Sequence, residues 1–176
     1  TPRDNDPVRS VRGTVLSLRD DSTPPIDLAR RRIRFRVAAS RGYRGGVRAV
    51  PGGHAGDPTQ PGSNGGGVLA VHNANGSGEV VTLPLPAKHW RRKGSARRPR
   101  RYEYRDRRGE SGPIERLVVE RNGAIRLVGA GPGWTYTLNE PAQGRVAVRL
   151  QLGRGDVWCS SFVPRADRVD RFLGRS

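Results

Sequence analysis

The sequence predicts an all-β protein, an antiparallel β-sandwich of about eight to ten strands with long Gly/Pro-rich and Arg-rich loops. Apolar residues recur at every second position in most runs of residues 101–162, which is the period of a half-buried strand. Asn122-Gly123 and the Gly-Pro-Gly run at 131–133 separate these runs with residues that tight turns favour. Only 34% of the residues are hydrophobic, while 24 are Gly and 14 are Pro, and this composition suits sheets better than a helix bundle. Residues 101–162 therefore predict a five-stranded antiparallel meander.

The length of 176 residues suits one domain with a core of its own. We expect residues 1–7 to be a disordered lead-in and residues 8–163 to form the sandwich. Residues 164–176 are expected to be a C-terminal tail that forms a short amphipathic turn of helix or docks against a neighbour. The predicted core comprises Ile33, Phe35, Val37, Leu69, Val71, Leu83, Tyr102, Tyr104, Leu117, Ile125, Leu127, Trp134, Tyr136, Val146, Val148, Leu150 and Phe162.

Two strands are predicted near the start of the chain, at Val8–Leu18 and at Arg31–Val37. In the second strand the apolar residues share one face and the arginines share the other. Arginines on one face of a strand lie about 6.6 Å apart. Such a ladder faces water, meets carboxylates on a neighbouring strand, or binds an anion. Its members are Arg32, Arg34 and Arg36.

A Gly/Pro-rich loop follows over residues 41–67, and loops of this length are usually functional or disordered. Tyr43 lies among Arg41, Arg44 and Arg48, so it either stacks on a sugar ring or base or is a plain loop residue. No Gly-Lys-Ser/Thr follows the glycines, which argues against a phosphate-binding loop.

Residues 67–86 predict a hairpin whose sequence is similar to residues 123–141, through either internal duplication or convergence on the same turn constraints. Residues 88–101 predict a charged loop or a basic arm. Trp90 in this stretch either plugs the core at a sheet edge or serves as a ligand platform.

The charge is unevenly placed. The 33 Lys and Arg residues against 16 Asp and Glu residues give a net charge of +17, and the acid-free stretches 28–56 and 80–102 hold nearly the whole excess. Clustered like charge indicates either a solvated basic surface or a face that binds a polyanion. The predicted anion-binding residues are Arg32, Arg34, Arg36, Arg41, Tyr43, Arg44, Arg91, Arg92, Arg97 and Arg98.

A series of short motifs lies between Asp57 and Phe162. In chain order these are DP, a Gly-rich turn, VLAVHN, LPLPAKHW, YEYRD, GPIERLVV, YTL, RVAVRLQLG and WCSSF. This order resembles an uncharacterised repeat module of secreted bacterial proteins. The resemblance implies an extracellular, all-β, non-catalytic module. The cysteine of such modules usually has a disulfide partner, which Cys159 lacks because it is the only cysteine of this chain.

No catalytic or metal-binding signature stands out. The three histidines lie in separate segments without metal-ligand spacing, and Cys159 lies in a predicted strand, where it packs as a small hydrophobic residue. Glu103 is expected to face Arg101 or Arg105 near a polar hairpin tip. We therefore expect no enzyme activity, no cofactor and no metal.

These observations favour a non-catalytic, secreted binding module whose arginine-rich faces engage an acidic polysaccharide or an acidic protein surface. The alternative is a structural subunit of an extracellular multi-chain assembly. Nucleic acid is a weaker candidate because aromatic residues make up only 6% of the chain and few lie among the basic runs. The chain contains no methionine, so we expect that a preceding secretion signal is cleaved or that the chain is excised from a longer one. The expected location is secreted or at the cell surface, with the periplasm as an alternative, and no run of ~18 apolar residues predicts a membrane span.

Overall fold

The computed structural model describes residues 8–21, 24–39, 49–50, 53–54, 56–73, 77–140, 142–155 and 157–176. Within these residues the chain is all-β, with no α-helix and three single-turn 3-10 helices, η1 (Leu28–Arg30), η2 (Gly62–Asn64) and η3 (Ala87–His89). The first seven strands are β1 (Val8–Ser10), β2 (Gly13–Arg19), β3 (Arg32–Val37), β4 (Ala49–Val50), β5 (Gly53–His54), β6 (Gly67–Asn73) and β7 (Val80–Leu85). The others are β8 (Trp90–Gly94), β9 (Pro99–Arg105), β10 (Ile114–Glu120), β11 (Ile125–Ala130), β12 (Val146–Leu152), β13 (Val157–Arg168) and β14 (Arg171–Arg175).

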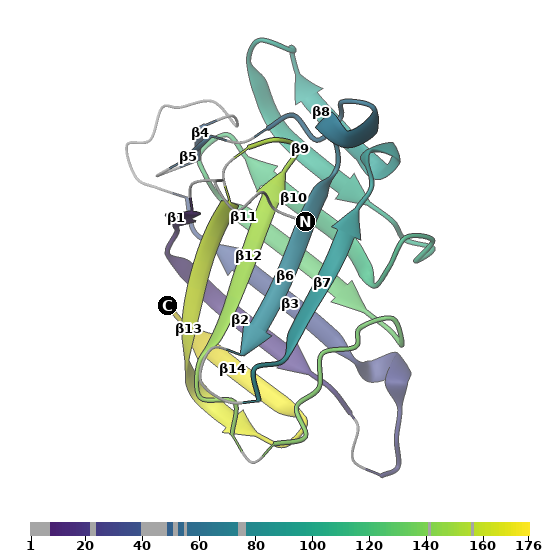
Figure 1. Ribbon diagram of the computed structural model, residues 1–176, viewed down its shortest axis with the longest axis vertical. Helices are drawn as coiled ribbons and strands as arrows, with labels where there is room; N and C mark the ends of the chain where they lie inside the picture. Colours follow the sequence, from purple (N-terminus) through teal and green to yellow (C-terminus); the bar gives the residue numbers. More distant parts are fainter. Residues whose placement is uncertain are drawn as a thin grey trace.

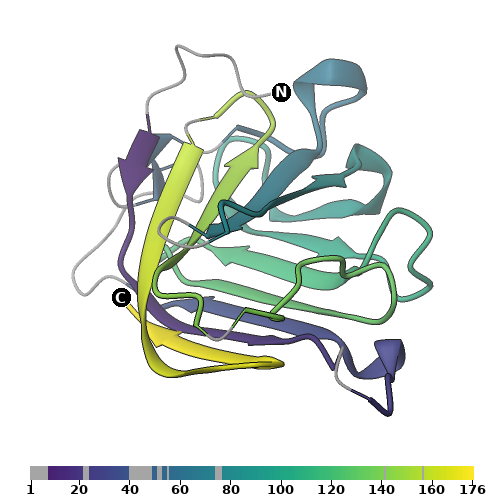
Figure 2. The ribbon, with the colours of Figure 1, turned by 60° about the horizontal axis from the view of Figure 1, so that its bottom comes forward.

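One antiparallel sheet in the order β7-β6-β12-β13-β14-β2-β3-β11-β10-β9-β8 forms a half-barrel (Figure 1). β1 pairs in parallel with β13, and β4 and β5 form a separate ribbon. The sheet turns at β13, because the first half of this 12-residue strand pairs with β12 and its second half pairs with β14. Figure 2 shows β13 running down one side of the molecule and turning into the β13–β14 hairpin. The all-β antiparallel prediction is confirmed, whereas the arrangement as a sandwich is not.

The core fills the concave side of the sheet. Every predicted core residue is buried except Leu83, which is partly buried against the others. Phe35 of β3 meets Phe162 of β13 edge to face at 5.9 Å between ring centroids, so the two halves of the sheet share one core. Trp90 is buried as a core plug: its indole lies against Tyr104 and donates a hydrogen bond to the Leu85 carbonyl at 3.0 Å.

Two basic segments are strands rather than loops or tails. Residues 88–101, predicted as a charged loop or basic arm, contain β8 and the start of β9, which pair as a hairpin. Residues 164–176, expected to form a helical turn or a docking tail, complete β13 and form β14. Arginine alternates only weakly with apolar residues in both segments, so their sequences lack the period-2 pattern of a strand. They form strands because they pair with neighbouring strands.

The predicted meander is wrong at the connection from β11 to β12, while β12 and β13 are antiparallel neighbours as predicted. β8 to β11 do follow one another as an antiparallel meander, but the chain then crosses over so that β12 pairs with β6 and β13. The predicted first strand, Val8–Leu18, is also two strands, because β1 pairs with β13 and β2 pairs with β14 and β3. Residues 67–86 form the predicted β6–β7 hairpin, whereas the similar residues 123–141 form no hairpin.

The crossover segment between β11 and β12 is irregular in its described residues, although it lies inside the predicted meander. Trp134, Tyr136 and Leu138 alternate as in a strand and are fully or almost fully buried. At residues 137 and 138, however, the backbone N–H groups donate to carboxylates instead of to a neighbouring strand. Asp20 accepts from the Leu138 N–H at 3.0 Å, and Glu79 accepts from the N–H of the residue before it, also at 3.0 Å. The alternation of apolar residues therefore reflects burial in the core and not pairing within the sheet.

Candidate anion-binding face

The arginine ladder predicted on β3 lies on the exposed side of the strand. β3 alternates between exposed and buried residues, with Ile33 in the core and Arg34 facing solvent. Within the described part of the chain, none of the three ladder arginines forms an ion pair. The ladder residues are Arg32, Arg34 and Arg36.

The strand register adds further arginines beside the ladder. Arg19 of β2 lies directly opposite Arg32, and Arg171 of β14 lies directly opposite Arg19. On the other side of β3, Arg126 of β11 lies opposite Arg36. Directly opposed residues share one face of a sheet, and like charges in such pairs are destabilising. We call this solvent-facing side of β14, β2, β3, β11, β10, β9 and β8 the arginine face.

A buried carboxylate organises the far part of the arginine face. Glu103 of β9 is only 2% exposed and accepts from Arg105 Nε at 2.8 Å and from Arg116 Nε at 3.0 Å, while Arg101 Nη2 lies 3.6 Å away. The prediction that Glu103 faces Arg101 or Arg105 is confirmed. Burial opposes ionisation of Glu103, but the hydrogen bonds and charges of Arg105 and Arg116 outweigh it and hold its pKa below the usual value.

The hairpin arginines predicted to bind anions do not act as one group. Arg91 lies opposite Glu103 and so belongs to the arginine face. Arg92 lies opposite the buried Tyr102 and is already paired with Asp57 at 2.9 Å, so it holds the β8 edge to the segment before β6. The local sequence pattern did not indicate this pairing, because Asp57 lies 35 residues away in the chain.

The remaining predicted residues have other positions. Arg97 and Arg98 are exposed in the turn between β8 and β9. Arg41, Tyr43 and Arg44 lie outside the described residues, as do residues 1–7.

Four arginines near the ladder were not predicted from the sequence, because they lie outside the two acid-free basic stretches 28–56 and 80–102. Arg19 ends β2 and pairs with Asp21 at 2.8 Å, and Arg126 alternates with the buried residues of β11. The alternation in β2 and β11 could have indicated their outward direction, but not that they would lie beside β3. The other two missed arginines are Arg168 and Arg171.

One cluster contains the residue types of a hydrolase triad but not its geometry. His89 Nε2 lies 3.0 Å from Ser111 Oγ and 3.8 Å from Asp106 Oδ2. A triad needs the hydroxyl and the carboxylate on different ring nitrogens, so that one orients the ring while the other exchanges a proton. Asp106 instead accepts the backbone N–H groups of Glu110 and Ser111 at 3.0 and 2.7 Å, and thereby stabilises the β9–β10 turn.

The other candidate features are a metal site, the Cys159 thiol and a membrane span. In the described ranges no three His, Cys, Asp or Glu side chains are grouped as a metal site. Cys159 is half-buried on β13 opposite Arg149, and burial raises the pKa of its thiol although the Arg149 charge acts in the opposite direction. None of the helices in the described residues is long and apolar enough to cross a membrane.

Comparison with known proteins gives no match to a family model, to a curated protein or to a solved structure.

Proposed function

We propose that the chain is a non-catalytic, secreted binding module whose arginine face engages an acidic polysaccharide. The observation that carries the proposal is the β3 ladder, in which Arg32, Arg34 and Arg36 face solvent without a carboxylate partner among the described residues. Arg171, Arg19 and Arg126 extend it across neighbouring strands.

Without a bound anion, the arginine face carries unfavourable repulsion between like charges. Arginines that lie directly opposite one another on a sheet repel, and an anion that lies across them relieves the repulsion. Each guanidinium offers a planar fork of donors to carboxylate, sulfate or phosphate. Because ladder arginines recur about every 6.6 Å along the strand, a linear polymer with regularly spaced charges suits the face better than one compact charge does.

The test is charge reversal on the ladder. We expect Arg34→Glu/Arg36→Glu to weaken binding to immobilised heparin more than tenfold at low salt, because two contacts become repulsive. Thermal stability is expected to stay nearly unchanged, since both side chains are solvated. Arg107→Glu/Arg108→Glu is the matched control: it changes the net charge equally on exposed residues of the β9–β10 turn, which β11 and β10 separate from β3.

Unaltered heparin binding by the ladder variant would contradict the proposal. Equal weakening of heparin binding by the control variant would show that the change in net charge alone causes the effect. Poly-glutamate and single-stranded DNA, titrated with salt in parallel, separate an acidic polypeptide and a nucleic acid from the sulfated polysaccharide. Unfolding of the ladder variant, together with a multi-chain species in size-exclusion chromatography with light scattering, would favour the structural-subunit alternative.

A further inference from the structure

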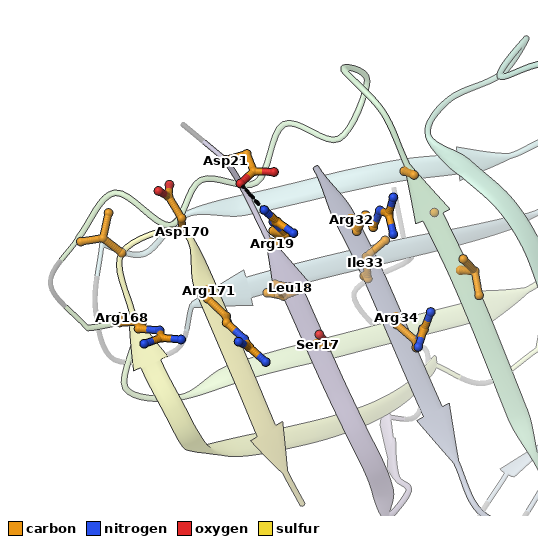
Figure 3. Close-up of a pocket in the computed structure, with 14 residues that line it drawn as sticks. Ser17, Leu18, Arg19, Asp21, Arg32, Ile33, Arg34, Arg168, Asp170 and Arg171 are labelled. Atoms are coloured by element: carbon orange, nitrogen blue, oxygen red, sulfur yellow. Dashed lines mark hydrogen bonds and ion pairs between the residues drawn. The ribbon is translucent and has the colours of Figure 1, made fainter. Parts of the chain in front are cut away.

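A hollow of about 620 Å³ lies on the arginine face beside the turn between β13 and β14. β2, β3, β11 and the β13–β14 hairpin all contribute to its lining. Figure 3 shows that its charged side chains stand on the same side of these strands. They are Arg19, Asp21, Arg32, Arg34, Arg168, Asp170 and Arg171.

The hollow has an excess of positive charge, with five arginines against two aspartates. Asp21 is committed to Arg19, whose Nε and Nη2 both donate to Asp21 Oδ1, at 3.0 and 2.8 Å. The other four arginines form no ion pair with any residue that the structure describes. Arg171, Arg19 and Arg32 form a direct cross-strand row, so three adjacent strands each bring one positive charge to this hollow.

The backbone of the hollow is also unusual. Asp21 has φ of 52° and Asp170 has φ of 66°, and they are the two non-glycine residues with positive φ in the described segments. Aspartate adopts the left-handed region more readily than most residues, and here it lets the chain turn directly after β2 and between β13 and β14. The turn at Asp21 brings its carboxylate back onto Arg19, which fixes the Arg19 guanidinium at the rim (Figure 3).

We propose that this hollow is a subsite for a phosphate or sulfate ester. The inference rests on the proposed function and deepens it, since it names the group that the arginine face binds most tightly. A carboxylate has two acceptor oxygens in one plane, which one or two guanidinium forks satisfy. A phosphate or sulfate ester offers three terminal oxygens in different directions, and these suit donors that arrive from β14, β2 and β3.

The rim of the hollow fits an ester that is attached to a larger body. Val128 and Val169 line the hollow and are 39% and 45% exposed, on opposite sides of the arginine row. Apolar side chains beside a charged site cover the carbon skeleton that carries the ester. The ester can thus belong to a polysaccharide or to a small molecule, and the two sources are distinguished by experiment.

The experiment compares two arginine pairs on the same face. Arg32→Gln/Arg171→Gln removes two charges inside the hollow, and Arg36→Gln/Arg126→Gln removes two outside it. Calorimetric titration uses inorganic tripolyphosphate, a fully sulfated disaccharide, heparin and citrate. We expect the hollow pair to weaken tripolyphosphate and disaccharide binding about tenfold or more and the outer pair to weaken it less than about threefold. Citrate, which carries only carboxylates, is expected to bind the unmodified protein more weakly than tripolyphosphate does.

Several outcomes would overturn the inference while leaving the proposed function intact. Heparin binding without binding of either tripolyphosphate or the sulfated disaccharide is one, and equal weakening by both arginine pairs is another. Citrate binding as tight as tripolyphosphate binding would overturn the preference for phosphate or sulfate oxygens over carboxylate oxygens. If the unmodified protein binds none of the probes, both proposals are contradicted. Arginine Nε–Hε NMR signals of the unmodified protein provide a readout independent of variant folding, because tripolyphosphate should shift those of Arg32 and Arg171 more than that of Arg126.

Discussion

The described arginines differ in whether a carboxylate lies within reach of the guanidinium. Arg31 lies 2.9 Å from the fully buried Asp20 and also donates to the Trp134 carbonyl, so it is a structural residue. Arg92 is structural in the same way through Asp57. Arg34, on the strand that follows Arg31, faces solvent with no such partner among the described residues. The ladder arginines proposed to bind an anion therefore differ from the structural arginines in having no carboxylate partner among the described residues.

Glu103 gives a prediction for acid stability. Its folded pKa lies below the usual value of 4.5, so its interactions stabilise the fold at pH values above 4.5 and are lost as the pH falls through the folded pKa. We expect the melting temperature to decline below about pH 4.5 and Glu103→Gln to flatten that decline. At neutral pH the variant should lose about 1–2 kcal/mol, because a buried acceptor for charged donors is weakened. Differential scanning calorimetry between pH 3 and 7 tests this.

The matched control for that variant is Glu115→Gln, which neutralises an exposed carboxylate on β10. It should follow the unmodified protein at every pH. An acid decline of the same steepness in Glu103→Gln would show that other carboxylates determine it.

At the scale of elements, the crossover residues 131–140 and 142–145 contribute to the core without pairing as a strand of the sheet. Its aromatic rings Trp134 and Tyr136 stack at 6.1 Å between centroids and are completely buried. Asp167 of β13 accepts the N–H groups of Gln143 and Gly144, each at 2.7 Å, so the end of the segment is fixed as well. The segment thus joins the two halves of the sheet through core contacts and carboxylate hydrogen bonds.

Trp134→Ala tests whether the segment is part of the core. We expect a loss of about 3–5 kcal/mol of unfolding free energy, the range for a large aromatic deleted from a packed core. Urea unfolding followed by circular dichroism measures it. Thr135→Ala is the control, since its side chain is exposed, and should cost less than about 0.5 kcal/mol. A loss for Trp134→Ala as small as that of the control would mean that the segment detaches without disturbing the sheet.

At the scale of the whole molecule, the last strand is an internal part of the sheet. β14 lies between β13 and β2, and its Phe172 is completely buried. The half of the sheet that carries the arginine face is therefore continuous with the other half through β13 and β14. Net charge of +17 on this scaffold favours rapid encounter with anionic polymers at low salt.

Truncation after Arg168 should therefore abolish the cooperative fold. The deletion removes Phe172 from the core and leaves β2 without its β14 partner. We expect loss of the thermal transition in circular dichroism, whereas removal of the exposed Ser176 alone should leave it unchanged. A truncated protein that melts as the full chain does would show that β14 is dispensable.

The candidate site was predictable in part. The outward direction of Arg34 follows from alternation with Ile33 and Phe35, because successive side chains of any strand point to opposite faces. The contribution of Arg171 was not predictable, because residues 164–176 gave no clear strand period. Arg92 lies in a basic stretch and was therefore predicted to bind an anion. Its pairing with Asp57 could not be predicted, because Asp57 lies far away in the sequence.

By itself the sequence determined the all-β class, a large part of the core and the solvent-facing side of β3, since all three follow from local alternation and turn residues. Only the tertiary structure decided which strands are neighbours. The pairing of β2 with β14 places Arg19 beside Arg171, which is 152 residues later in the chain, and creates the hollow. Local periodicity carries no information about such partners, because register between distant strands is selected by the packing of the complete core.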